Sequence, residues 1–196
     1  PRVRRQRQMC IRDRNLVDSE EMLGLLTGSG HEIVDSEEEA DAIVINTCCF
    51  IHDAKEESVN TILEMAEYKK TGNCKALIVT GCMAQRYKEE ITQEIPEVDA
   101  VLGTTSYGDI VKALNEVQAG HVFQEFRDIN ELPEDSGRRV LTTGGHFGYL
   151  KIAEGCDKHC TYCIIPSLRG RFRSVPEERL LAQAEYMASQ LSLIHI

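Results

Sequence analysis

The sequence has no apolar run long enough to cross a membrane and no secretory signal pattern at its start. A membrane-spanning helix needs roughly 20 consecutive apolar residues. Basic residues are also in deficit, since 22 Lys and Arg stand against 32 Asp and Glu, which gives a net charge of −10. This balance argues against a broad nucleic-acid-binding face. We expect a cytoplasmic protein with no membrane partner.

Two further patterns are missing. No glycine-rich phosphate loop follows any run that reads as a strand, which argues against a nucleotide-binding module. The two short-spaced cysteine pairs typical of zinc sites are also absent. Disulfide scaffolds belong mainly to small secreted chains. The eight cysteines therefore favour metal or redox chemistry.

Three of the cysteines form the one closely spaced cluster, Cys156, Cys160 and Cys163, in a C-x3-C-x2-C pattern on an expected loop. Three thiolates can hold three irons of a four-iron cluster, and with no fourth cysteine nearby one iron stays open to an outside ligand. An open iron is a reaction site. The alternatives are a zinc site completed by His159, a disulfide, or structural thiols.

From Asn15 onward, short runs rich in Ile and Val alternate with helical periodicity. The runs predict strands at 31–34, 41–46, 75–80, 99–102 and 122–126. The periodic segments predict a helix that ends at Gly28 and further helices at 54–70, 84–94 and 107–117. This alternation predicts an α/β fold with a parallel sheet flanked by helices.

Two more cysteines follow predicted strands directly. Cys48 comes after the strand ending at Asn46, and Cys82 comes after the strand ending at Thr80. If these strands are parallel neighbours, both thiols emerge at the same edge of the sheet, where open α/β folds bind ligands. They could share a second cluster. The alternative is that they are small buried residues, as we expect of Cys49 and Cys74.

The composition divides the chain into four parts. Residues 1–14 are arginine-rich without periodicity and resemble translated adapter sequence, so we interpret them as non-native, with a similar interpretation for 191–196. Residues 15–127 form the α/β domain, and 128–145 look like a linker. Residues 146–196 start a second domain, with a strand at 149–153, the cysteine loop, and a helix from a capping box at Ser174 to about Gln190. An α/β barrel needs roughly 200 residues or more, so this second domain is expected to be truncated.

Five segments besides the cysteine loop carry a resemblance to a known family: Asn15–Glu20, Asn46–Cys48, Ala54–Ser58, Thr80–Tyr87 and Cys163–Gly170. In this order they resemble the methylthiotransferases of the radical S-adenosylmethionine superfamily, from Asn15 to about Gln190. The resemblance implies an amino-terminal methylthiotransferase domain followed by the start of a radical S-adenosylmethionine barrel.

The resemblance also implies cofactors and partners. Cys156, Cys160 and Cys163 would hold a 4Fe-4S cluster that binds S-adenosylmethionine, and Cys48 and Cys82 would hold part of a second 4Fe-4S cluster. An electron-donor protein would reduce the first cluster. Asn15–Glu20 and Ile164–Gly170 are more similar to the RimO branch, whose substrate is an aspartate of ribosomal protein uS12 in the small ribosomal subunit. The alternative is the MiaB branch, which acts on a tRNA adenosine.

The chain departs from the family pattern at one position. A cysteine would stand three residues before the asparagine that matches Asn15, but this position is Arg12, and Cys10 is out of register. The resemblance then implies that the second cluster lacks its third ligand and that the first strand of the sheet is missing. We expect this fragment to be inactive and to bind one cluster at most.

Smaller expectations concern residues around the cysteine loop. Tyr162 is expected to pack beside the cluster or to make a simple apolar contact. The run Arg169, Arg171 and Arg173 is interpreted as a solvated face, with contact to the cofactor carboxylate or substrate as the alternative. An alternative of another functional class is a non-catalytic α/β binding module with a structural metal.

Overall fold

The computed structural model describes residues 2–5, 13–133, 137, 139–143 and 145–190. Within them, six parallel strands form one sheet in the order β2-β1-β3-β4-β5-β6. The strands are β1 (Arg2–Arg5), β2 (Glu32–Val34), β3 (Ala42–Thr47), β4 (Ala76–Gly81), β5 (Ala100–Leu102) and β6 (Phe123–Glu125).

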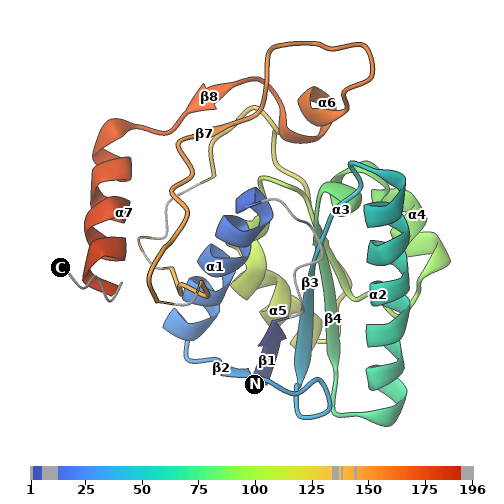
Figure 1. Ribbon diagram of the computed structural model, residues 1–196. Coiled ribbons are helices and arrows are strands. Elements are labelled where there is room, and N and C mark those ends of the chain that lie inside the picture. The colour runs from blue at the N-terminus through green and yellow to red at the C-terminus, as the bar shows by residue number, and fades with distance from the viewer. Residues whose placement is uncertain (1, 6–12, 134–136, 138, 144, 191–196) are drawn as a thin grey trace.

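Helices cover both faces of this sheet (Figure 1). One face packs against α1 (Asp13–Gly28) and α5 (Ile110–Gln118), which follows the short 3-10 helix η1 (Tyr107–Asp109). The other face packs against α2 (His52–Thr71), α3 (Cys82–Arg86) and α4 (Lys88–Glu94). The α/β class predicted from the alternation of strands and helices is confirmed.

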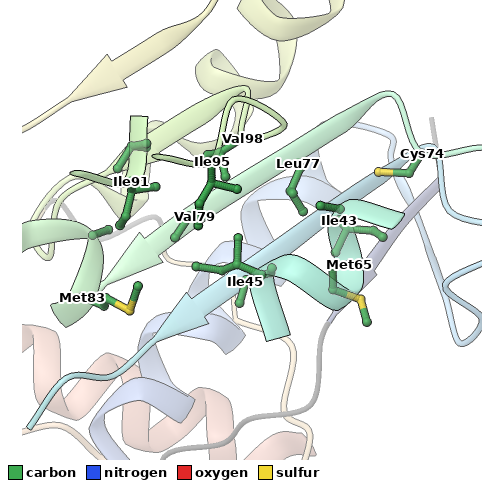
Figure 2. Packing of buried hydrophobic residues seen from close by; sticks show 14 of the residues in the cluster. Ile43, Ile45, Met65, Cys74, Leu77, Val79, Met83, Ile91, Ile95 and Val98 are labelled. Carbon is green, nitrogen blue, oxygen red and sulfur yellow. The ribbon is translucent and has the colours of Figure 1, made fainter. Parts of the chain in front are cut away.

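The core follows from the two-residue period of the central strands. Ile43 and Ile45 of β3 and Leu77 and Val79 of β4 point to the face covered by α2, where they pack with Met65 (Figure 2). The intervening residues of the same strands pack under α1 and α5 on the other face. Both faces are thus buried, which explains why these strands are continuous apolar runs.

The expectation that the sheet lacks its first strand is wrong. Arg2–Arg5 form β1, which pairs in parallel with both β2 and β3. Strand pairing is made by backbone groups and depends little on the side chains. The Val3 side chain is buried, with 1% of its surface exposed. The Arg2 amide donates to Asp41 Oδ2 at 2.9 Å, and the Asp41 amide donates to the Arg2 carbonyl at 2.8 Å. Cys10 and Arg12 lie outside the described residues, and the interpretation of 1–14 as non-native stays a prediction.

The last part of the chain contains β7 (Ala153–Glu154) and β8 (Arg173–Ser174), which pair antiparallel, and the helices α6 (Ile165–Arg169) and α7 (Glu177–Gln190). β7, β8 and α6 lie beyond the carboxyl ends of the strands, whereas α7 lies on the α1 side of the sheet (Figure 1). The helix predicted from the capping box is confirmed as α7. The strand predicted at 149–153 is wrong in extent, because only Ala153 and Glu154 have a partner strand. None of the helices in the described part of the chain is long and apolar enough to span a membrane.

Candidate functional site

Cys48 and Cys82 lie at the same edge of the sheet, as the parallel arrangement predicts. Thr47 and Gly81 are register partners at the ends of β3 and β4, and each cysteine follows one of them. The strands approach closely here: Gly81 has φ of 95°, and a Cβ on it would lie 2.4 Å from the Thr47 carbonyl oxygen. Glycine is required at this position because it avoids both the clash and the strain.

Cys49 adds a third thiol that sequence reasoning had treated as structural. Its Sγ lies 3.3 Å from the carbonyl oxygen of Cys82 and donates a hydrogen bond to it. Burial, followed by the charges of Cys82 and Cys48, raises the pKa of Cys49 to about 12. Cys49 therefore keeps its proton at neutral pH. The signal available in the sequence was its position next to Cys48 at a strand end.

Hydrogen bonds from two helices fix the loop that carries Cys48. The Cys48 amide donates to Ser58 Oγ of α2 at 3.1 Å, and that hydroxyl donates to the Cys48 carbonyl at 2.9 Å. On the other side, Asn46 Nδ2 donates to the Asn15 carbonyl at 3.0 Å and to Ser19 Oγ at 2.9 Å. These bonds explain in physical terms why the motifs at 15–20, 46–48 and 54–58 occur together.

The loop of Cys156, Cys160 and Cys163 arches away from the sheet between β7 and α6 (Figure 1). Its base is closed by a hydrogen bond from the Cys156 amide to the Gly170 carbonyl at 3.1 Å. Gly155 has φ of 76°, and a Cβ on it would lie 2.0 Å from the Arg171 carbonyl oxygen, so glycine is required there too. The Cys163 amide donates to the Cys160 carbonyl at 2.9 Å.

The thiols of this loop have the accessibility that a reactive centre requires. Cys160 is exposed, Cys156 and Cys163 are half-buried, and the seven cysteines that the structure describes form no disulfides. Across the described part of the chain, no three His, Cys, Asp or Glu side chains are gathered as a preformed metal site. Three reduced thiols on one closed loop nevertheless fit an iron-sulfur cluster by the chemistry of the donor set.

Buried charges connect this loop to the amino-terminal domain. Lys151, just before β7, pairs with Asp18 of α1 and with Glu154 at 3.0 Å. Burial alone would raise the pKa of Asp18, but the charges of Lys151 and Arg169 outweigh it and hold that pKa below its ordinary value. Burial likewise opposes the charge on Lys151, but Asp18 and Glu154 raise its pKa. Asp18 and Lys151 thus remain ionised together.

The expectation that Arg169 lies on a solvated face is wrong. Arg169 is 6% exposed, because its guanidinium reaches α1. Tyr162 is 90% exposed, so it makes no substantial apolar contact with the described residues, and its packing beside a cluster stays a prediction. Arg171 is exposed as expected, whereas Arg173 is half-buried and donates to the carbonyls of Arg169 and Arg171.

Residues 12–103 match the family model described as uncharacterized protein family UPF0004. The matched residues contain the whole of α1 as well as Cys48, Cys49 and Cys82, and the last of them follows β5.

Curated relatives extend the similarity beyond the UPF0004 domain. The chain is 63% identical over 176 residues to a protein of Lachnoclostridium phytofermentans named ribosomal protein uS12 methylthiotransferase RimO. It is 49% identical over 175 residues to a protein of the same name from Clostridioides difficile. These matches cover 90% and 89% of this chain but only 40% and 39% of the relatives. The chain therefore spans about two fifths of the length of the relatives that it matches.

The predicted resemblance to methylthiotransferases of the RimO type is confirmed by these matches. The first match leaves only 20 of the 196 residues outside. It must therefore include both cysteine sets, at 48–82 and at 156–163. The assignment of Cys48, Cys82, Cys156, Cys160 and Cys163 as ligands stays a prediction.

Proposed function

We propose that this chain is the amino-terminal part of an enzyme that methylthiolates an aspartate of ribosomal protein uS12 by radical S-adenosylmethionine chemistry. The observation that carries the proposal is the similarity, over nine tenths of the chain, to proteins named for this activity. The two cysteine sets and the loop geometry around them support it. The partners would be uS12 or the small ribosomal subunit and an electron-donor protein, in the cytoplasm.

Cys156, Cys160 and Cys163 would hold a 4Fe-4S cluster, with the open iron taking S-adenosylmethionine. When bound, this cluster would supply the electron that cleaves the cofactor. The protein's contribution is to present the three thiols on a loop of fixed ends. Gly155 permits the tight turn before Cys156, and Asp157 Oδ1 accepts a hydrogen bond from the Phe172 amide at 3.0 Å. These contacts hold the start of the loop against β8.

Cys48 and Cys82 would be two of the three cysteine ligands of a second 4Fe-4S cluster. Ser58 fixes the backbone of Cys48, and the β3–β4 register places Cys82 beside it. Arg12 stands where the family pattern has the third cysteine. We propose that this chain is inactive by itself, because that ligand is replaced and the chain spans about two fifths of its relatives' length.

A hybrid protein tests the proposed activity. The carboxyl-terminal part of the Lachnoclostridium phytofermentans relative is joined to this chain, with Arg12→Cys introduced. The purified hybrid is loaded anaerobically with iron and sulfide and incubated with uS12 or with tRNA, together with S-adenosylmethionine, sulfide as sulfur source and dithionite as electron donor. We expect mass spectrometry to find one methylthio group on uS12 and none on tRNA. Replacing Cys156, Cys160 and Cys163 by serine provides the inactive control. Modification of the tRNA alone would favour the MiaB type, and no modification of either would contradict the proposal.

A further inference from the structure

Arg169 joins the segment of the Cys156–Cys163 loop to α1, through Glu154 on one side and Asn15 and Asp18 on the other. It is the last residue of α6, six residues after Cys163. Its Nη1 donates to Asp18 Oδ2 at 2.8 Å, and its Nη2 donates to Asn15 Oδ1 at 2.7 Å. Asn15 in turn donates from Nδ2 to the carbonyl of Thr47 at 3.4 Å, immediately before Cys48. The guanidinium is thus two hydrogen bonds away from the backbone of Thr47, the residue before Cys48.

The same side chain pairs with Glu154, two residues before Cys156, and lies within electrostatic range of Cys82. Glu154 Oε1 lies 3.5 Å from Arg169 Nη1, and both carboxylate oxygens are buried without a hydrogen bond, so charge alone holds this group. Burial would lower the pKa of Arg169, but the negative charges of Cys82, Asp18 and Glu154 raise it well above its ordinary value. The guanidinium is therefore a permanent cation within electrostatic range of both cysteine-bearing segments.

Backbone contacts on each side of Arg169 attach α6 to the sheet edge and to the loop base. The Leu168 side chain is buried in the same core cluster as Met83, and its carbonyl accepts a hydrogen bond from Thr104 Oγ1 at 2.7 Å. The Gly170 carbonyl accepts the Cys156 amide. A Cβ on Gly170 would lie 2.3 Å from the Ile129 carbonyl oxygen, so the backbone is closely packed there.

We propose that Arg169 is a positioning residue that holds the loop of Cys156–Cys163 in a fixed place relative to Cys48 and Cys82. The significance of this coupling rests on the proposed function, in which both cysteine sets serve one reaction. The coupling itself is a property of the chain without metal. A planar guanidinium suits the task, because its two amino groups reach two acceptors on α1 at fixed angles, whereas a lysine ammonium lacks this fork.

Arg169 can be replaced without removing every positively charged partner of the Asp18 and Glu154 carboxylates. Lys151 remains beside Asp18 and Glu154 when Arg169 is replaced. Arg139 offers a matched control, because it too is buried and its Nε donates to Glu20 of α1 at 2.8 Å. Its Nη2 also donates to Glu20, and its Nη1 donates to the Tyr149 carbonyl at 2.7 Å in the segment before β7 and to Met187, so none of its printed bonds leads to a cysteine.

Amide hydrogen exchange, followed residue by residue by NMR on the reduced, metal-free chain, measures the coupling. We expect Arg169→Met and Arg169→Lys to speed exchange of the Cys156 amide by about tenfold or more, the effect of losing one charge-assisted hydrogen bond. The amides of β3 and β4 should keep their rates. Arg139→Met should leave the Cys156 amide unchanged. If Arg169→Met does not fold, Arg169→Lys carries the comparison.

Three results would overturn the proposal. They are an unchanged Cys156 amide in both Arg169 variants, a Cys156 amide that responds equally to Arg139→Met, or full protection in Arg169→Lys. The last would mean that charge without the fork suffices, as expected for a merely stabilising cation. Because no metal is present, failure of the chain to bind iron would contradict the proposed function and leave this result standing.

A spectroscopic readout complements the exchange rates. After anaerobic addition of iron and sulfide and one-electron reduction, the EPR signal of a cluster on Cys156, Cys160 and Cys163 should be broader in Arg169→Lys than in the parent chain, because the loop samples more conformations. Arg139→Met should give the parent spectrum. Identical spectra for the parent and Arg169→Lys would also contradict the positioning role.

Discussion

The thiol of Cys49 donates a hydrogen bond to the backbone carbonyl of Cys82, with 3.3 Å between Sγ and oxygen. This contact joins the loop after β3 to the first residue of α3, which follows β4 directly, at the edge of the sheet that carries Cys48. Cys49 therefore differs in role from its neighbour Cys48, because the Cys49 thiol is a buried hydrogen-bond donor.

The raised pKa of Cys49 predicts its reactivity. With the pKa moved from 9.0 to about 12, its thiolate population near neutral pH falls by roughly a thousandfold. We expect iodoacetamide at pH 8 to modify the exposed Cys160 while leaving Cys49 intact, as measured by mass spectrometry of proteolytic peptides. Modification of Cys49 at a rate similar to Cys160 would contradict this expectation.

The same shift affects stability at high pH. The folded state holds the Cys49 proton more tightly than the unfolded state, so its contribution is fully present below the unfolded pKa. It is lost as the pH rises from 9.0 toward about 12. Cys49→Ala should reduce this alkaline loss in the free energy of unfolding, measured by urea titration at several pH values. An unchanged slope in the variant would argue against Cys49 as its source.

Gly81→Ala should destabilise the chain strongly, because the new Cβ meets the Thr47 carbonyl oxygen at 2.4 Å in a left-handed backbone conformation. We expect a loss of about 3 kcal/mol or more in the free energy of unfolding, since strain and steric overlap add. Gly120→Ala is the control: φ there is 87°, but nothing lies within 4 Å of the added atom. It should cost only about 1 kcal/mol. Equal losses in urea titrations would refute the close-approach argument.

Glu20 is expected to be the most sensitive acidic residue of α1. Its carboxylate is fully buried, with Arg139 Nη2 at 2.6 Å and both the Thr142 amide and hydroxyl at 2.7 Å. Glu20→Ala leaves a buried guanidinium without this partner, which should cost about 3–5 kcal/mol. Glu67→Ala removes the exposed pair with Lys70 and should change stability by less than about 0.5 kcal/mol. Thermal and urea unfolding of both variants would measure the contrast.

The proposed function predicts how many irons the chain binds. If Arg12 replaces the third ligand of a second cluster, the anaerobically reconstituted chain should bind about four irons, and Arg12→Cys should raise this to about eight. Iron analysis and Mössbauer spectroscopy give the two values, with Cys74→Ser as a control that leaves the content unchanged. Two full clusters in the chain with Arg12 would show that this position is not needed.

Much of the fold could be predicted from local patterns. Runs such as 41–46 and 75–80 are apolar on both faces, which indicates central parallel strands, and the capping box before α7 predicted that helix. The common edge of Cys48 and Cys82 followed from the same rule, because parallel strands place their carboxyl ends together. β1 was missed because four residues with one apolar side chain carry no periodic signal.

The sequence by itself determined the alternation of elements, the cysteine spacing and the family resemblance, since each depends on neighbouring residues. Only the tertiary structure decided that Arg169 is buried and that Cys49 contacts Cys82. Arg169 and Asp18 are 151 residues apart, and no local pattern distinguishes an arginine that reaches a distant carboxylate from one in water. Burial of Arg169 depends on the packing of α6 against α1, which the sequence does not reveal. The run of arginines was therefore interpreted as a solvated face from the sequence alone.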